Sequence, residues 1–292
     1  MLLTLMPIKG ASFTFLLLIV LSSYFHAKAH SQDPNHHLNN RDDLSHWPDP
    51  ETPYTLPPDP IPLSTREHWM RRAVEALSDL NDGSPCPFAA FGCVIVNHSA
   101  VATGRGGIAD VELGVELGSE VCIGANAIVR EGNPTMHGEV AAINNCTAIL
   151  TDPAGKYKLT GPEALKALGD LSLYTTAEAC PMCTSAILYG GFKEYIFSTS
   201  IPTLRSHNWP QIVIRSTEIF ARSVGRLSAH RTRIVGEVWA NETEELFRWQ
   251  FGGAQAACPR GCVWEADGEG AHGGCVKGNV EEAGVYAHKD EL

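Results

Sequence analysis

Two short segments carry side chains whose chemistry restricts how this chain can fold. The first is Thr-Met-His-Gly-Glu at residues 135–139, and the second is Glu-Ala-Cys-Pro-Met-Cys at residues 178–183. Together they supply one imidazole and two thiols, which with a fourth position left open are the ligands of a catalytic zinc site. The fold must therefore bring both segments to one point. The candidate zinc ligands are His137, Cys180 and Cys183, and Glu139 is the carboxylate expected to move protons.

The spacing of the two cysteines predicts a helix. Cys180 and Cys183 are three residues apart, so one helical turn directs both sulfurs to one side. Pro181 is tolerated in the first turn of a helix, which places both thiols at the helix N-terminus. The helix dipole there favours thiolate over thiol. His137 is expected to begin a different helix, so two helix starts would face each other.

Hydrophobic periodicity and turn residues predict an α/β fold between residues 64 and 251. Ser64 and Glu67 have the spacing of a capping box, so a helix is expected to start there. Strands are expected at 91–96, 120–125, 171–176, 194–198 and 233–239, and helices at 136–150, 162–168, 180–188, 217–223 and 241–251. We expect the first two strands to pair antiparallel. Strands that alternate with helices predict a three-layer α/β/α sandwich around a five-stranded mixed sheet.

The ends of the chain differ in composition from this domain. Residues 1–29 contain an apolar run too short to span a bilayer and then a small-x-small sequence, which indicates a cleaved signal peptide rather than an anchor. Residues 30–63 form a polar, Pro-rich linker. Residues 252–292 form a Gly-rich acidic tail that ends in Lys-Asp-Glu-Leu, an endoplasmic reticulum retention signal. We therefore expect the protein in the lumen of the endoplasmic reticulum.

An oxidising lumen changes how the nine cysteines are interpreted. Thiols there tend to be paired or bound to metal. Without Cys180 and Cys183 seven remain, so at least one stays unpaired within the chain. Cys93 and Cys122 would approach each other if their strands pair. Two of Cys258, Cys262 and Cys275 are expected to cross-link the tail, with a small zinc knuckle as the alternative.

Three Asn-x-Ser/Thr sequons indicate a glycoprotein. They begin at Asn97, Asn145 and Asn241. Asn241 also has the spacing of an N-cap, with Glu244 three residues later. Since a glycosylated asparagine would cap poorly, these two interpretations compete.

The segments resemble a known family once they are taken together. His-x-Glu followed by Cys-x-x-Cys is the signature of the zinc-dependent nucleobase deaminases. Residues 91–96, 124–126, 133–139 and 209–212 also resemble segments of the cytidine/deoxycytidylate deaminase-like family, most closely its guanine deaminase and tRNA adenosine deaminase branch. The resemblance covers most of residues 64–251 and implies the cytidine-deaminase-like sandwich, bound Zn²⁺ and a dimer or larger assembly.

The resemblance also implies roles for individual residues. It assigns zinc binding to His137, Cys180 and Cys183, proton transfer to Glu139, and contact with the substrate base to Asn126. An asparagine after Gly-Ala also has a simpler interpretation, which is that it ends a strand. The chain departs from the family at Gly138, where alanine is usual, and at Ala179, where proline is usual. Longer loops near 102–118 and 152–170 also distinguish it.

The net charge of −11 and the lack of a basic run disfavour nucleic acid as a partner. We therefore expect hydrolytic deamination of a small nucleobase, nucleoside or related amino-heterocycle, with release of ammonia. The first alternative is an endoplasmic reticulum thiol–disulfide oxidoreductase with Cys180 as nucleophile, which would leave His137 and Glu139 without a role. The second is a family member that binds zinc and has lost catalysis. A purely structural zinc site would need a fourth protein ligand, and none is identified.

Overall fold

The computed structural model describes residues 61–81, 83, 85–98, 109–110, 115–223, 232–252, 257–266 and 273–278. All of them belong to one compact unit that begins at Pro50. The expected signal peptide, most of the Pro-rich linker and the C-terminal retention signal lie outside the described residues. Among the helices that are described, none combines the length and the hydropathy of a membrane span.

A five-stranded mixed sheet forms the centre of the domain, as the sequence predicted. Its strands, in spatial order, are β4 (Ser119–Ala125), β1 (Gly92–Asn97), β5 (Ser172–Ala177), β6 (Glu194–Thr199) and β7 (Arg233–Val235). Strand β1 pairs antiparallel with β4 and with β5, while β5, β6 and β7 run parallel. The expected antiparallel pairing of the first two strands is confirmed.

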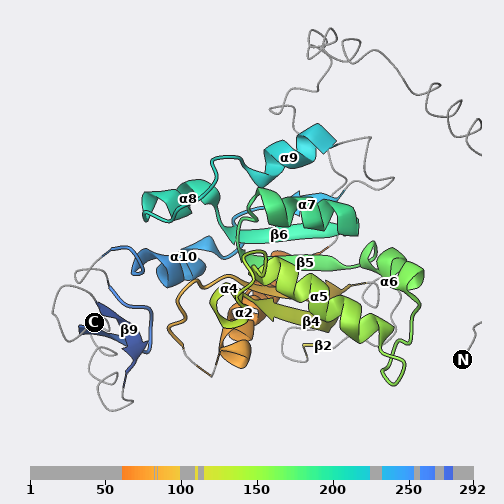
Figure 1. Ribbon diagram of the computed structural model, residues 1–292, viewed down its shortest axis with the longest axis horizontal. Helices are drawn as coiled ribbons and strands as arrows, with labels where there is room; N and C mark the ends of the chain where they lie inside the picture. Colours follow the sequence, from red (N-terminus) through yellow and green to blue (C-terminus); the bar gives the residue numbers. More distant parts are fainter. Residues whose placement is uncertain are drawn as a thin grey trace, which may run out of the picture. The chain divides into compact units, whose positions relative to one another are not determined.

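Helices cover both faces of this sheet, which makes three layers (Figure 1). Because side chains alternate along a strand, Cys93 and Ile95 of β1 join one core cluster while Val94 and Val96 join another. The first cluster packs under α5 (Gly138–Thr151), α6 (Gly161–Leu168), α7 (Pro181–Gly190) and α9 (Ser216–Ser223). The opposite face packs against α2 (Leu63–Leu80) and α10 (Ala240–Arg248).

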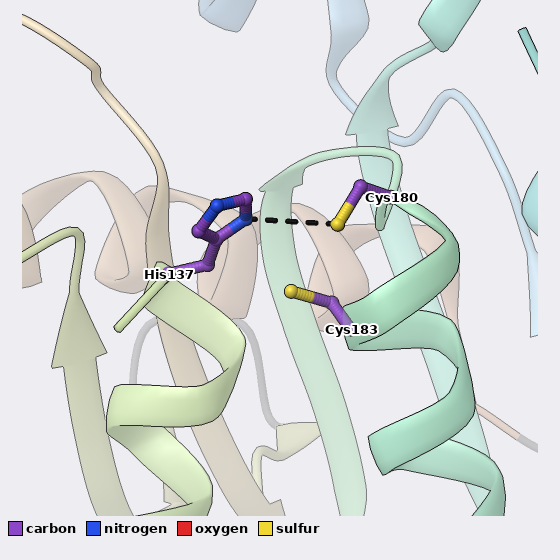
Figure 2. Close-up of side chains that lie close together, drawn as sticks. All are labelled: His137, Cys180 and Cys183. Atoms are coloured by element: carbon purple, nitrogen blue, oxygen red, sulfur yellow. Dashed lines mark hydrogen bonds between the residues drawn. The ribbon is translucent and has the colours of Figure 1, made fainter. Parts of the chain in front are cut away.

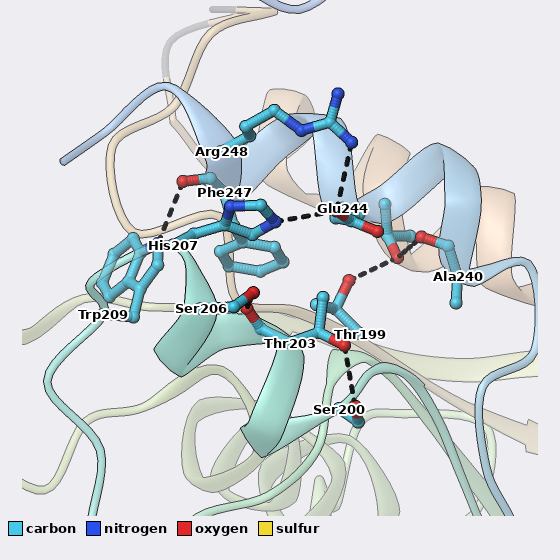
Figure 3. A network of polar contacts seen from close by, with 11 residues as sticks. Thr199, Ser200, Thr203, Ser206, His207, Trp209, Ala240, Glu244, Phe247 and Arg248 are labelled. Carbon is cyan, nitrogen blue, oxygen red and sulfur yellow. Dashed lines mark hydrogen bonds and ion pairs between the residues drawn. The ribbon is translucent and has the colours of Figure 1, made fainter. Parts of the chain in front are cut away.

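The segment after β6 is joined to α10 by polar contacts. Helix α8 (Ile201–Ser206) ends beside His207, whose Nε2 lies 2.7 Å from Oε1 of Glu244. The indole of Trp209 donates a hydrogen bond to the Phe247 carbonyl at 3.1 Å. Figure 3 shows these contacts between the segment that follows α8 and helix α10. They hold residues 200–209 beside the end of β6.

Two helix starts differ from the sequence expectation. Helix α2 begins at Leu63 with Pro62 as its N-cap, and no side chain caps it, so the Ser64–Glu67 capping box is wrong. Helix α10 has Trp239 as its N-cap, so Asn241 lies in the first turn and does not cap. A capping box forms instead at Thr160 and Glu163, at the start of α6. Helix α2 begins directly after Pro62, and α10 begins after Trp239, whose backbone lies in the left-handed region.

The C-terminal segment contains a hairpin where a flexible tail was expected. Strands β8 (Cys262–Ala266) and β9 (Gly273–Lys277) pair antiparallel. Disulfides fix it, with Cys258 bonded to Cys275 and Cys262 bonded to Cys86. The expected local cross-link is therefore present, and the zinc knuckle is wrong. Shorter elements are α4 (Ile128–Glu131), β2 (Ala109–Asp110) and β3 (Val115–Glu116).

The remaining cysteines are divided between a third disulfide and three thiols. Cys122 of β4 is bonded to Cys146 of α5. The expected approach of Cys93 to Cys122 is wrong, because β1 and β4 pair in a register that sets Cys93 opposite Gly124. Cys93, Cys180 and Cys183 are the free thiols of the described chain. One cysteine besides the candidate ligands thus stays unpaired, as the odd count predicted.

Candidate zinc and catalytic site

Two helix starts face each other at one edge of the sheet. His137 is the N-cap residue of α5, and Cys180 is the N-cap residue of α7, each with an extended backbone. Pro181 occupies the first turn of α7, where its missing N–H costs nothing. Cys183 follows within the same turn. The predicted placement of the ligands at two helix starts is therefore what the structure shows.

The three side chains converge. The ligand atoms of His137, Cys180 and Cys183 all lie within 4.8 Å of one another. Nδ1 of His137 lies 3.6 Å from Sγ of Cys180, and Figure 2 shows the imidazole and both sulfurs turned toward a common point. One imidazole and two sulfurs suit zinc, which favours nitrogen and sulfur ligands. The two sulfurs remain thiols in a chain that holds three disulfides, which fits their use as metal ligands.

The thiols of the pair differ strongly in acidity. Hydrogen bonds from Cys183 and then His137 outweigh burial and lower the pKa of Cys180 to about 4. The same contact with Cys180, together with burial, raises the pKa of Cys183 well above its usual range. The Cys180 contact also raises the pKa of His137. Cys180 is thus a thiolate near neutral pH before any cation binds, which is the form that coordinates a metal.

Glu139 lies next to this group in the first turn of α5. Its side chain is buried, with 3 % of its surface exposed. Burial, followed by the charge on Cys180, raises its pKa to about 6. A carboxyl group with a pKa near the working pH can both accept and donate a proton. Its position and acidity suit the proton-transfer role that the sequence predicted.

Asn126 directly follows β4, so it does end a strand. Its backbone N–H donates to the Phe91 carbonyl at 3.0 Å, and its Oδ1 accepts the N–H of Ile128 at 3.3 Å. The same Phe91 carbonyl packs against the Cα of Gly138. Asn126 therefore lies at the edge of the sheet where α5 begins, beside the metal-ligand helix. A contact with substrate remains a prediction.

Gly138 is required by this packing. A Cβ atom at residue 138 would overlap the Phe91 carbonyl, and one at Gly124 would overlap the backbone of α5. The start of α5 therefore lies directly against β1 and β4. The sequence marked Gly138 only as a departure from the family, and the structure shows that it allows this close approach.

Four residues for which the sequence predicted no role hold the turn before Cys180. The carboxylate of Glu178 has no exposed surface and pairs with Nε of Arg215 at 2.7 Å. It also accepts the backbone N–H and the hydroxyl of Ser216 at 2.9 and 2.8 Å. Tyr195 accepts the N–H of Ala179 at 2.6 Å. Glu178 could have been found from its position two residues before Cys180. No spacing in the sequence connects Glu178 with Arg215, Ser216 or Tyr195.

Comparison with known proteins agrees with this geometry. Residues 63–199 match the sequence model of the family described as the cytidine and deoxycytidylate deaminase zinc-binding region. That matched range contains the candidate ligands, Glu139 and Asn126. The matched residues are therefore similar to the zinc-binding region of these deaminases, and the curated relatives are named as cytosine and guanine deaminases, which are hydrolases that act on carbon–nitrogen bonds.

Individual relatives are more distant. The chain is 24% identical over 173 residues to a probable cytosine deaminase of Schizosaccharomyces pombe, covering 58% of this chain and 81% of that protein. It is 29% identical over 133 residues to a guanine deaminase of Bacillus subtilis, covering 45% of this chain and 63% of that protein. A solved guanine deaminase from Nitrosomonas europaea is 14% identical with a TM-score of 0.40, over 62% of this chain and 82% of that one.

Proposed function

We propose that this protein is a zinc-dependent hydrolytic deaminase of a small nucleobase, nucleoside or related amino-heterocycle. The observation that carries the proposal is the convergence of His137, Cys180 and Cys183 within 4.8 Å, with buried Glu139 beside them. The match to the deaminase family and the names of the curated relatives support the reaction class. The formal charge of −11 supports a small substrate over a nucleic acid.

The residues of the candidate site have separate roles in the proposed reaction. His137, Cys180 and Cys183 would hold the zinc ion, which when bound lowers the pKa of water toward about 7. Glu139 takes a proton from the attacking water and delivers it to the departing amine. The carbon–nitrogen bond breaks, a carbonyl forms on the ring, and ammonia leaves. Asn126 would orient the base through its side-chain amide.

The experiment is an ammonia-release assay on guanine, cytosine, cytidine, adenosine and pterins, with Glu139→Ala as the control. We expect release from at least one substrate by the wild-type protein, and a loss of at least 100-fold in Glu139→Ala, since general acid–base catalysis contributes about 10² to 10⁴-fold. Full activity in Glu139→Ala would overturn the proton-transfer role. Release from none of the zinc-loaded wild-type reactions would favour the non-catalytic alternative.

The thiol–disulfide oxidoreductase alternative uses the same cysteines differently. It requires Cys180 and Cys183 to form a disulfide reversibly, and neither the family match nor the curated relatives point to that chemistry. In the structure both are thiols. Insulin reduction by the metal-free protein would support this alternative, whereas we expect none.

We also propose residence in the lumen of the endoplasmic reticulum, from the apolar N-terminal run and the terminal Lys-Asp-Glu-Leu. The three disulfides support an oxidising compartment. Removal of residues 289–292 should redirect the protein to the medium. Glycosidase treatment would show whether Asn97, Asn145 and Asn241 carry glycans. Light scattering would test the homodimer that the family resemblance implies.

A further inference from the structure

The turn that carries Cys180 is held by the phenol of a residue on the neighbouring strand. The N–H of Ala179 donates a hydrogen bond to the Tyr195 hydroxyl at 2.6 Å. Both residues are fully buried, so water cannot replace either partner. A buried N–H without a partner costs about 1–3 kcal/mol. The phenol is therefore what satisfies Ala179 in this position.

The other backbone groups of the turn are held from within α7 and β6. The N–H of Glu178 donates to the Thr199 carbonyl at 2.8 Å. The carbonyl of Ala179 accepts the Thr184 hydroxyl at 3.0 Å, and the carbonyl of Cys180 accepts the Thr184 N–H at 2.8 Å. By contrast, the partner of the Ala179 N–H is a side chain, the phenol of Tyr195 on β6. It fixes the residue directly before the metal-ligand cysteine.

The Tyr195 ring cannot move freely. It stacks on Phe220 of α9 with ring centroids 5.8 Å apart and an interplanar angle of 12°. Its hydroxyl also contacts the side chain of Ser216, in the first turn of the same helix. The Ser216 hydroxyl in turn donates a hydrogen bond to Glu178 at 2.8 Å. The phenol thus joins the two residues that precede Cys180, one directly and one through Ser216.

We propose that Tyr195 is a positioning residue for the zinc-ligand turn, acting through the N–H of Ala179 and, by way of Ser216, through Glu178. The inference rests on the proposed metal site. Proline cannot donate a backbone hydrogen bond, so a chain with alanine at position 179 has an N–H that needs a partner. Tyr195 supplies that partner.

The test is the zinc dissociation constant of Tyr195→Phe, measured by competition with a chelator at neutral pH. This variant keeps the stacked ring and removes the hydroxyl. The matched control is Tyr174→Phe, because Tyr174 is an equally buried tyrosine on β5 whose hydroxyl contacts His98 and faces α2. We expect Tyr195→Phe to bind zinc about 10- to 100-fold more weakly, as is typical for residues that support a ligand. Tyr174→Phe should stay within about 2-fold of wild type.

Equal affinity in Tyr195→Phe and wild type would overturn the proposal, and so would equal weakening by both variants. If the wild-type protein binds no zinc, the metal site itself fails, which is a distinguishable result. Should Tyr195→Phe not fold, amide hydrogen exchange on the wild-type protein decides. We expect slow exchange at Ala179, and rapid exchange there would contradict the hydrogen bond to Tyr195.

Discussion

Gly138 lies so close to the carbonyl group of Phe91 that residue 138 has no room for a side chain. The contact joins the first residue of α5 to the residue before β1. Since His137 immediately precedes Gly138, the close approach also sets the position of a candidate zinc ligand. The start of α5 is thus fixed by backbone packing as well as by the sequence of the motif.

Gly138→Ala should therefore destabilise the fold and weaken zinc binding together. The Cβ would force the start of α5 away from β1, and overpacking of this kind costs about 1–3 kcal/mol. Thermal unfolding and chelator competition would measure the two effects. Gly161→Ala is the control, since it stands at the first position of α6 with nothing within 4 Å of its Cβ. Unchanged stability and zinc affinity in Gly138→Ala would show that α5 can shift without loss.

Cys180 should react with iodoacetamide in the metal-free protein well below the pH at which ordinary thiols react. Its pKa is lowered to about 4, first by the Cys183 hydrogen bond. Peptide mass spectrometry between pH 5 and 8 should show nearly constant labelling of Cys180. Buried Cys93, whose pKa is raised by burial, serves as the internal control and should stay unlabelled. Labelling of Cys180 that rises about tenfold per pH unit would contradict a thiolate.

Zinc should protect the same thiol. Saturating zinc at pH 7 is expected to reduce Cys180 labelling by more than tenfold, because a coordinated sulfur is a poor nucleophile. Magnesium at the same concentration is the control, since it prefers oxygen ligands. Equal labelling with zinc and with magnesium would indicate that Cys180 binds no zinc.

His98 should make the fold sensitive to acid. It is buried at the end of β1, with Nε2 2.9 Å from the Tyr174 hydroxyl. Burial lowers its pKa from 6.5 to about 4. As the pH falls, the unfolded chain therefore binds a proton at His98 before the folded chain does. The stability contributed by neutral His98 is present above pH 6.5 and is lost as the pH falls toward 4. The shift corresponds to about 3 kcal/mol.

Denaturant unfolding at pH 7 and pH 4 would measure this loss. In His98→Gln, which cannot titrate, the difference in unfolding free energy between the two pH values should shrink by about 3 kcal/mol. The comparison uses each protein as its own reference, so the cost of the substitution at pH 7 cancels. The same pH dependence in both proteins would contradict a buried neutral imidazole.

The hairpin β8–β9 should depend on its link to Cys86. Replacing Cys86 and Cys262 by serine opens a disulfide whose cysteines are 176 residues apart. We expect a loss of about 2–4 kcal/mol in unfolding free energy, with zinc affinity unchanged because neither cysteine belongs to the ligand group. A large fall in zinc affinity would show that the hairpin supports the site.

Local patterns were sufficient to predict the sheet, the main helices and the ligand group. The apolar, β-branched run of β1 and the cysteine spacing of α7 are properties of neighbouring residues, and the structure has both elements where they were expected. The resemblance added Asn126, whose substrate contact is still untested. These predictions succeeded where the physical cause lies within one turn or one strand.

What could not be predicted depends on contacts between distant segments. The hydrogen bond between Ala179 and Tyr195 and the fit of Gly138 against Phe91 exist only after β1, β6 and the two helix starts are assembled. The partner of Cys122 depended on how α5 packs against β4. Likewise, the hairpin in the Gly-rich tail is held by disulfides whose connectivity the spacing of cysteines does not define.

The account rests on a metal bound by His137, Cys180 and Cys183, and native mass spectrometry of the full chain tests this most directly. We predict one zinc ion per chain, with Cys180 and Cys183 both reduced, and loss of the ion in His137→Ala. A metal-free protein in which Cys180 and Cys183 are joined by a disulfide would contradict the account.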